Sequence, residues 1–281
     1  MSPASASPVS STRLAFIGGG NMARSLIGAL LRGGVKATSI AVAEPHAATR
    51  DALAKDFGVA VHEHAAAAAA NAEILVLAVK PQVMQAVCAE IAAAVEAHRP
   101  LVISIAAGIR LDQFERWLGA GTPLVRVMPN TPALIGAGAS GLFANAHVSE
   151  SRRAQAAAIL AAAGSTAWIE SEALMDSVTA LSGSGPAYFF LLVEAMIDAA
   201  VAQGLPRETA TALATQTCLG AGRMLVESGE APSLLRERVT SPGGTTAAAL
   251  DAFAAGDLRG LVARALDAAQ RRGGTLSAQY D

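Results

Sequence analysis

The sequence predicts an α/β fold in which an N-terminal doubly wound parallel sheet is followed by an all-helical C-terminal domain. Three features indicate this fold. Short apolar segments alternate with helical segments through the first 170 of the 281 residues. A glycine-rich turn joins the first apolar segment to the first helix. From residue 172 to residue 272 no segment has the character of a strand, and long helices rich in alanine and leucine are expected instead.

The expected elements of the first domain follow one another in a regular order. Their apolar segments are short and continuous, as in strands that are covered on both faces. Strands are expected at residues 13–17, 39–43, 59–61, 73–79, 101–105, 123–128 and 166–169. Helices are expected at residues 24–32, 50–57, 65–70, 83–97, 111–118 and 150–163. In such a fold, ligands bind outside the carboxyl ends of the strands.

The first strand runs into the sequence Gly-Gly-Gly-Asn-Met-Ala at residues 18–23, directly before a helix. This is a G-x-G-x-x-A pattern in the strand–turn–helix context of a Rossmann-type dinucleotide site. Gly18 permits the tight turn, Gly20 lets a pyrophosphate approach the backbone, and Ala23 lets the helix pack closely on the sheet. The pattern in this context predicts dinucleotide binding.

An acidic residue, Glu44, ends the second expected strand. A carboxylate at this point can accept hydrogen bonds from the ribose hydroxyls, which favours NADH over NADPH. His46 and Arg50 follow closely enough to meet a 2′-phosphate, so the cofactor preference stays open. The alternative is an acid in a solvated loop.

Two further strand ends carry residues suited to a ligand. Lys80 follows the strand at 73–79 and is one of only three lysines in the chain, with Lys36 and Lys55. The strand at 101–105 ends in Ala-Ala-Gly, whose small side chains leave room for a flat ring against the backbone. Both ends belong to the edge at which a dinucleotide is expected.

The second domain is expected to bind substrate and to dimerise. Its helices are expected at residues 187–203, 207–228 and 246–255, and glycine and proline mark their starts. The first two are apolar around much of their circumference, so they must be buried against a partner. We expect a disordered tail at 1–12, a dinucleotide-binding domain at 13–170 and the helical domain at 171–281.

The sequence Val-Thr-Ser-Pro-Gly-Gly-Thr-Thr at residues 239–246 opens directly onto a helix. Gly243 and Gly244 allow a tight turn and the close approach of a ligand. The first amides of the helix have no partner within it and lie at the positive end of its dipole, so a carboxylate or phosphate is the expected guest. The alternative is a turn followed by an ordinary helix cap.

Composition excludes several other functions. The net charge of −2 and the lack of a long basic run argue against nucleic acid. Cys88 and Cys218 constitute neither a disulfide framework nor a metal site, and they fit a reducing cytoplasm. No apolar run reaches the ~18 residues of a membrane span without a polar break. The N-terminal residues show no signal-peptide pattern.

Six motifs in order resemble the pyrroline-5-carboxylate reductase family, from about residue 13 to residue 272. They are the glycine turn, Ala-Val-Lys-Pro-Gln at 78–82, Ser-Ile-Ala-Ala-Gly at 104–108, Val-Met-Pro-Asn-Thr-Pro at 127–132, Thr-Ala-Leu-Ser-Gly-Ser-Gly-Pro-Ala-Tyr at 179–188, and the turn at 239–246. The last two are more specific than the glycine turn. The resemblance implies an oxidoreductase acting on a C=N group, which uses NADPH or NADH to reduce 1-pyrroline-5-carboxylate to L-proline, the last step of proline biosynthesis.

The resemblance also implies site residues. The expected cofactor contacts are Gly18, Gly19, Gly20, Asn21, Met22, Ala23, Val79, Lys80, Pro81, Ile105, Ala106 and Ala107; Glu44 is added to them from its place at the end of a strand. The expected substrate contacts are Glu172, Ser241, Gly243, Gly244, Thr245 and Thr246. A helical domain that interlocks with a second copy is implied too, giving a homodimer, with a higher oligomer such as a decamer left open. Two departures from the family are Glu44, where a small polar residue is frequent, and Ala65, where some members have an asparagine near the adenosine.

The chemistry read from the residues agrees. A protonated imine already accepts hydride, so the protein needs no strong general acid, and the helical domain contains no lysine. Catalysis is then mainly orientation, with Thr246 hydrogen-bonded to the ring nitrogen or the carboxylate. A hydroxyacid dehydrogenase would need a general base, which the motifs lack. A dinucleotide-binding regulator without turnover is the other alternative, and a cofactor oxidation assay separates the two.

Overall fold

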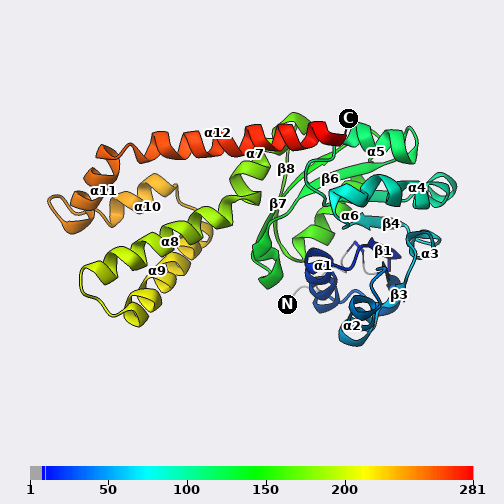
Figure 1. Cartoon of the computed structure of the whole chain (residues 1–281), viewed down its shortest axis with the longest axis horizontal. Coiled ribbons are helices and arrows are strands. Elements are labelled where there is room, and N and C mark those ends of the chain that lie inside the picture. The colour runs from blue at the N-terminus through cyan, green and yellow to red at the C-terminus, as the bar shows by residue number, and fades with distance from the viewer. Residues whose placement is uncertain (1–7, 10, 281) are drawn as a thin grey trace. The chain divides into compact units, whose positions relative to one another are not determined.

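The computed structural model describes residues 8–9 and 11–280 (Figure 1). The chain divides into two compact units. The first, which we call the sheet unit, comprises Met1–Ser184 and Ala269–Asp281, and the second, the helical unit, comprises Gly185–Ala268. The boundary expected at residue 170 precedes this division. The expected division of the chain into domains at residue 170 therefore stays a prediction.

The sheet unit is built on eight strands in the order β3-β2-β1-β4-β5-β6-β7-β8. The strands are β1 (Leu14–Ile17), β2 (Ile40–Ala43), β3 (Ala60–His62), β4 (Ile74–Leu77), β5 (Leu101–Ser104), β6 (Leu124–Met128), β7 (Gly138–Ala144) and β8 (Gly164–Trp168). From β3 to β6 all neighbours are parallel. The chain leaves β1 toward β2 on one side and returns to β4 on the other, so β1 and β4 flank the switch point of the fold.

The sheet departs from a wholly parallel arrangement at one edge. Strand β7 runs antiparallel to β6, and β8 pairs in parallel with β7. The link between β6 and β7 contains only the short helical turn η2 (Thr131–Ile135). A link of this length cannot carry the chain back across the sheet, which a parallel neighbour would require.

Helices cover both faces of the sheet, as predicted for a doubly wound fold. They are α1 (Asn21–Arg32), α2 (Ala47–Phe57), α3 (Ala65–Ala69), α4 (Pro81–His98), α5 (Leu111–Leu118) and α6 (Glu150–Ala161). Alternate strand residues feed two separate cores. Leu14 and Phe16 of β1 pack with α1 and α6, whereas Ala15 and Ile17 pack with α3, α4 and α5. These helices begin within a few residues of the expected positions.

The N-terminal tail expected at residues 1–12 lies mostly outside the described residues. Of its described part, Val9 is fully buried in one core and Thr12 is 8% exposed. The amide of Thr12 donates to the carbonyl oxygen of Val9 at 3.3 Å. The end of the expected tail is therefore packed on the sheet unit, because Val9 contributes apolar surface to its core.

The chain remains in the sheet unit beyond the last strand. The short helix α7 (Met175–Val178) and the π-helical turn η4 (Thr179–Gly183) both pack on β7. Gly141 on β7 leaves the space that Val178 fills, since a Cβ there would lie 2.5 Å from Val178 Cγ1. This close packing explains why the unit extends to Ser184.

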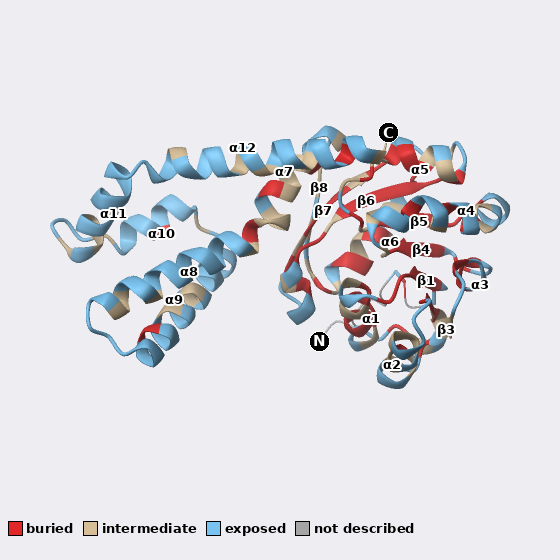
Figure 2. Ribbon diagram, in the orientation of Figure 1, coloured by how far each residue is buried: buried red, intermediate tan, exposed pale blue. Residues whose placement is uncertain are grey.

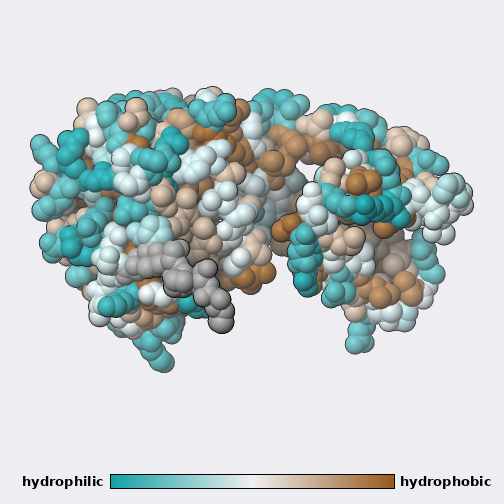
Figure 3. Space-filling view, turned by 180° about the vertical axis from the view of Figure 1, so that it is seen from behind, coloured by the Kyte–Doolittle hydropathy of each residue, from teal (hydrophilic) through white to brown (hydrophobic). Residues whose placement is uncertain are grey.

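The helical unit contains α8 (Gly185–Ala202), α9 (Arg207–Glu227), α10 (Pro232–Arg238), α11 (Thr245–Ala255) and the first part of α12 (Leu258–Ser277). Almost all of it is exposed (Figure 2). The exposed side chains include large apolar ones: Phe189 is 60% exposed, Phe190 68% and Leu191 66%. Hydrophobic residues lie at its surface in the view from behind (Figure 3). A unit with so much exposed apolar surface is suited to pack against another chain.

One helical stretch of the described chain, Glu172–Ala202, is long and apolar enough to cross a membrane by length and composition, and 6% of its most apolar window is buried. No such stretch was expected from the sequence, because polar residues such as Ser182, Ser184 and Glu194 interrupt its apolar run.

Candidate functional site

Three chain segments leave the sheet together at the switch point between β1 and β4. The amide of Ala78 donates to the carbonyl oxygen of Ile17 at 2.8 Å, and the amide of Ile105 donates to that of Leu77 at 3.1 Å. These bonds continue the ladders at the carboxyl ends of β1, β4 and β5. Residues 18–20, 78–80 and 105–107 therefore emerge side by side, as the sequence analysis expected of its cofactor-binding segments.

The glycine turn is closed at its first two residues and open at its third. Gly18 has φ +103°, and a Cβ there would lie 2.9 Å from the carbonyl carbon of Ala78. At Gly19 a Cβ would lie 2.5 Å from Leu53 Cδ1. At Gly20 it would meet nothing within 4 Å. Gly18 and Gly19 thus hold the turn against the sheet while Gly20 faces open space.

Helix α1 presents its first amides to that space. Gly20 is its N-cap residue, no side chain caps the helix, and its first turn contains no acid. Unpaired amides at the positive end of a helix dipole bind anions. Ala23 is buried, Met22 half-buried and Asn21 exposed. These residues fit a dinucleotide pyrophosphate.

Glu44, directly after β2, is held beside the glycine turn. Its carboxylate is 8% exposed at the residue level and accepts hydrogen bonds from two backbone amides. Oε2 accepts from Gly19 at 3.0 Å, and Oε1 accepts from His46 at 3.0 Å. The reading of Glu44 as a solvated loop acid is not supported, because two amides fix both its oxygens next to the turn.

Arg50 is turned toward the backbone in this structure. Its Nη1 donates to the carbonyl oxygens of Glu44 at 2.8 Å and Pro45 at 3.1 Å. Its Nη2 lies 3.7 Å from Glu63 Oε2. The guanidinium that could have met a 2′-phosphate is thus engaged by three oxygens.

The second segment supplies a cation. Lys80 is exposed and is the N-cap residue of α4, whose first helical position is Pro81. Val79 is half-buried, and its Cγ1 would lie 3.0 Å from a Cβ at Gly18. Val79 therefore touches the glycine turn, and Lys80 stands at the same edge of the sheet.

The third segment is a small-residue loop at residues 105–110. Ser104 at the end of β5 is buried, and its Oγ accepts from the amide of Ala106 at 3.3 Å. Ile105 is half-buried, Ala106 buried and Ala107 exposed. The loop ends at Arg110, whose amide donates to Gln113 Oε1 at 2.8 Å.

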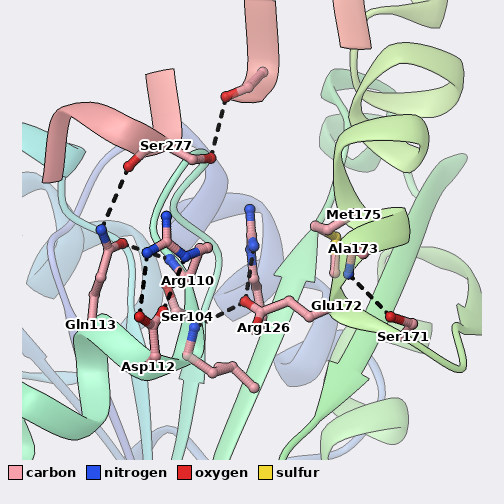
Figure 4. Close-up of polar contacts among 12 residues, drawn as sticks. Ser104, Arg110, Asp112, Gln113, Arg126, Ser171, Glu172, Ala173, Met175 and Ser277 are labelled. Atoms are coloured by element: carbon pink, nitrogen blue, oxygen red, sulfur yellow. Dashed lines mark hydrogen bonds and ion pairs between the residues drawn. The ribbon is translucent and has the colours of Figure 1, made fainter. Parts of the chain in front are cut away.

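Glu172 is bound within the sheet unit (Figure 4). Its Oε1 accepts from Arg126 Nη1 at 2.9 Å and from the amide of Leu111, the first residue of α5, at 2.9 Å. Arg126 is 4% exposed. Glu172 was expected from the sequence to contact substrate, whereas Arg126 was not expected to belong to a site. Arginine inside a strand of otherwise apolar residues was the signal that could have revealed it.

The neighbouring acid Asp112 belongs to the outer part of this cluster. Partial burial acts to raise its pKa, but hydrogen bonding to Arg110 and the charges of Arg110 and Arg116 lower the pKa below its ordinary value. Asp112 is therefore ionised at neutral pH and pairs with both arginines.

The turn at 241–246 lies in the helical unit. The amide of Gly244 donates to the carbonyl oxygen of Ser241 at 3.0 Å, and Gly243 has φ +70°. With Pro242 between them, this is the pattern of a type II turn. Gly244 is the N-cap residue of α11, and no side chain caps that helix. Thr245 and Thr246 are its first two residues, so the N-cap position belongs to the glycine.

Two of the motifs are joined to each other inside the sheet unit. Asn130 Nδ2 donates to the carbonyl oxygen of Ser182 at 3.0 Å, and its Oδ1 accepts from the amide of Ala139 at 2.9 Å. A Cβ at Gly183 would lie 2.6 Å from Met128 Cε. The motifs at 127–132 and 179–188 thus meet through the Asn130 side chain and through the contact of Gly183 with Met128.

Among the described residues no group of three histidine, cysteine, aspartate or glutamate side chains could hold a metal ion. Cys88 and Cys218 are both free thiols. Burial raises the pKa of Cys88 to about 12, so its thiol stays protonated at neutral pH. Neither cysteine belongs to the site.

The doubly wound sheet, the open glycine turn and the acid at the end of β2 define an NAD(P)-dependent oxidoreductase. Two family models match the chain. Residues 13–108 match one described as NADP oxidoreductase coenzyme F420-dependent, and residues 172–276 match one described as pyrroline-5-carboxylate reductase dimerisation.

Known proteins resemble the chain over nearly its whole length. A pyrroline-5-carboxylate reductase of Pseudomonas aeruginosa is 51% identical over 271 residues, which cover 96% of this chain and 99% of the relative. The structure of a pyrroline-5-carboxylate reductase from Coxiella burnetii superposes with a TM-score of 0.93 at 42% identity, covering 95% and 99% of the two chains. That of Plasmodium falciparum pyrroline carboxylate reductase with NADP bound has a TM-score of 0.82 at 29% identity, again covering 95% and 99%. The chain belongs to the pyrroline-5-carboxylate reductase family.

Proposed function

We propose that this protein reduces 1-pyrroline-5-carboxylate to L-proline with a hydride from NADPH or NADH, the last step of proline biosynthesis. One observation carries the proposal. Two helices, α1 and α11, begin at glycines that leave their first amides without a side-chain cap. A reductase of an anionic imine needs two anion receptors, one for the pyrophosphate of the dinucleotide and one for the carboxylate of the substrate.

The sheet unit binds the dinucleotide. Gly20, Asn21 and Met22 bring the amides of α1 to the pyrophosphate, while Gly18, Gly19 and Ala23 hold turn and helix against the sheet. Glu44 faces the adenosine ribose. Val79, Lys80 and Pro81 follow the phosphates, and Ile105, Ala106 and Ala107 form the surface against which the nicotinamide lies. Bound there, the dinucleotide supplies the hydride. The open space at Gly20 and the contact of Val79 with the glycine turn support this assignment.

The turn at 241–246 binds the carboxylate of the imine. Ser241, Gly243, Gly244, Thr245 and Thr246 provide amides and hydroxyls for it, and the positive end of the α11 dipole adds attraction. Gly243 at φ +70° sets the turn, a conformation that other residues adopt only with strain. Thr246, the proposed catalytic residue, orients the ring nitrogen or the carboxylate through its hydroxyl.

The main catalytic role of the protein is to orient the two reactants, and little acid–base chemistry is required of its side chains. The protonated imine is electron-poor before it binds, so hydride transfer needs no side chain of high acidity. The helical unit offers no lysine, and the motifs contain no histidine. Holding two reactants in line can lower the barrier by about 7–11 kcal/mol.

The protein works as an oligomer. We infer a homodimer formed by the helical unit, whose exposed Phe189, Phe190 and Leu191 would otherwise face water. A decamer built from such dimers is the larger assembly we propose. The same pairing covers the apolar stretch 172–202, so we place the protein in the cytoplasm rather than in a membrane. Its two free thiols fit a reducing compartment.

The test is the loss of reduced nicotinamide absorbance when the purified protein is mixed with 1-pyrroline-5-carboxylate, with NADPH and NADH assayed separately. We expect turnover that requires both the imine and the cofactor. A protein that binds the cofactor but does not oxidise it would instead be the regulator considered above. Oxidation with a 2- or 3-hydroxyacid and NAD(P)⁺, and none with the imine, would indicate a hydroxyacid dehydrogenase.

A further inference from the structure

The ion pair of Arg126 and Glu172 lies where the catalytic proposal has no use for it. Arg126 is 4% exposed and stands on β6, next to Ser104 of β5 in the sheet register. Its guanidinium reaches one oxygen of Glu172, and that oxygen also accepts from the amide of Leu111. The Arg126 side chain is 5% exposed and the Glu172 side chain 23%, so the pair is largely withdrawn from water, and such a pair is often no more stabilising than apolar residues would be. Stability alone therefore does not account for the Arg126–Glu172 pair.

That shared oxygen fixes one end of the loop at 105–110. Leu111 is the first residue of α5, and its amide is one of those that an α-helix leaves unpaired. Glu172 satisfies this amide with a carboxylate at the positive end of the helix dipole. The ion pair with Arg126 in turn sets where the carboxylate lies.

The other parts of the loop are fixed by separate contacts. Ile105 is bonded to Leu77 of β4, and Ala106 is bonded to the hydroxyl of Ser104. On its far side, a Cβ at Gly108 would lie 3.8 Å from Ser277 N near the end of α12. Gln113 Nε2 donates to the carbonyl oxygen of Ser277 at 3.5 Å. Figure 4 shows Glu172 between Arg126 and the start of α5. Two side-chain bonds thus fix the backbone where the loop passes into α5: Gln113 Oε1 accepts from the amide of Arg110, and Glu172 Oε1 accepts from the amide of Leu111.

We propose that Arg126 and Glu172 are positioning residues that hold the loop 105–110 at the place where the nicotinamide half of the dinucleotide binds. The inference rests on the proposed function, in which Ile105, Ala106 and Ala107 contact the nicotinamide. It assigns Glu172 a role different from the substrate contact expected from sequence. Loosening the ion pair should weaken binding of the nicotinamide half and spare the adenosine half, which the glycine turn and Glu44 hold.

The experiment compares two ligands on the full-length protein. Dissociation constants are measured for NADH, and for ADP-ribose, which lacks the nicotinamide, with the wild-type protein, Glu172→Ala and Glu172→Gln. For Glu172→Ala we expect Kd for NADH to rise roughly tenfold, a change of about 1.4 kcal/mol. Kd for ADP-ribose should stay within about twofold, a margin under 0.5 kcal/mol. Glu172→Gln keeps an oxygen that can accept from Leu111, so it should recover most of the loss.

Asp112→Asn is the matched control. It removes a charge from the same end of α5, but Asp112 has no bond to the amide of Leu111 among those that fix the loop. We expect both dissociation constants to remain at the wild-type value. Should Glu172→Ala fail to fold, Glu172→Gln and Arg126→Lys decide the matter, since Glu172→Gln keeps an acceptor oxygen for Arg126 and Leu111 and Arg126→Lys keeps a cation beside Glu172. For them the proposal predicts a smaller loss, again confined to NADH.

Equal losses for NADH and ADP-ribose, or none for either, would overturn the proposal. So would an unchanged NADH affinity accompanied by a raised KM for 1-pyrroline-5-carboxylate, which would mark Glu172 as a substrate contact. A wild-type protein that binds neither NADH nor NADPH would refute the proposed function itself. That outcome is separate from the others because it appears before any residue is changed.

Discussion

The amide of Gly19 donates to Oε2 of Glu44 at 3.0 Å, which fastens the acid at the end of β2 to the middle glycine of the turn. The second oxygen of the carboxylate accepts from the amide of His46 at 3.0 Å. A negative charge is thereby fixed beside the expected ribose, while Arg50 is bonded to backbone carbonyls and paired with Glu63. The charge next to a 2′-phosphate is therefore repulsive, and Arg50 can offset part of it only by leaving these partners.

We predict that both dinucleotides are used, with a modest preference, and that Glu44→Ser shifts kcat/KM toward NADPH. Removing a partly desolvated like charge should favour the phosphate by about 1–2 kcal/mol, or roughly five- to thirtyfold. Glu73→Ser is the matched control, because it removes an acid that is bonded to the amide of Arg13 and precedes the amino end of β4, away from the carboxyl ends of the strands. An NADPH/NADH ratio that Glu44→Ser leaves unchanged would show that this carboxylate does not face the ribose.

We predict that Thr246→Ala lowers kcat/KM for the imine. The corresponding activation free energy should rise by about 1.5–3 kcal/mol, the range of a hydrogen bond to a charged group. Cofactor affinity should hardly change, because the dinucleotide belongs to the sheet unit. A purely structural role of Thr246 in the first turn of α11 would instead lower the melting temperature and leave the kinetics intact. Melting temperature and steady-state kinetics are measured on one preparation. Thr245→Ala, at the preceding position, shows how much the loss of a neighbouring hydroxyl changes the same two quantities.

We predict a larger loss for Gly244→Val. A Cβ at Gly244 would lie 3.1 Å from the carbonyl oxygen of Ser241, so the turn must give way, and the added methyl groups would occupy space that the carboxylate needs. Both kcat/KM for the imine and the melting temperature should fall. Full activity toward the imine in this variant would contradict the assignment of the turn as the carboxylate receptor.

The thiol of Cys88 should make stability depend on pH in the alkaline range. Burial raises its pKa from the ordinary 9.0 to about 12, so the folded protein keeps a proton that the unfolded chain loses. Stability is unaffected below pH 9.0 and falls between pH 9.0 and about 12. The slope is at most about 1.4 kcal/mol per pH unit. Denaturant unfolding of Cys88→Ala should lack this share of the slope, whereas Cys218→Ala should keep it. A Cys88→Ala slope equal to that of the wild-type protein would refute the prediction.

Charge placed on the apolar surface of α8 should break the assembly. Phe190 is 68% exposed within one chain, so Phe190→Asp adds no clash inside the chain but buries a carboxylate in the inferred interface. Sedimentation should show dissociation or aggregation and loss of activity, while Glu96→Lys on α4 should sediment as the wild-type protein does. An active, stable wild-type monomer would refute the homodimer.

Most strands and helices of the fold could be predicted because they carry a local signal, whereas β7, α10 and α12 were not among the expected elements. Continuous apolar segments such as residues 74–77 and the glycine turn at 18–20 depend on neighbours in sequence. The antiparallel edge depends on the length of the link before β7 rather than on strand composition. The extension of the sheet unit to Ser184 depends on contact between Val178 and Gly141, which are distant in sequence.

The site could be predicted in part for the same reason. Glycines directly before a helix predict an anion receptor from neighbouring residues alone. Glu44 is predicted to be a site residue because it ends a strand. The bond from Leu111 to Glu172 and the charge of Arg126 cannot be read from sequence, because the residues come from three separate elements. The direction of the Arg50 side chain cannot be predicted from sequence either, since the sequence allows it to point toward the backbone or toward a bound phosphate.

The most direct test of the account is to follow the hydride. The protein is incubated with 1-pyrroline-5-carboxylate and with NADPH or NADH deuterated at the transferring position of the nicotinamide, and the product is analysed by mass spectrometry and NMR. The account predicts L-proline that carries the deuterium on the ring carbon which, in the substrate, is double-bonded to nitrogen. L-Proline without the label, or oxidation of the cofactor without any proline, would contradict it.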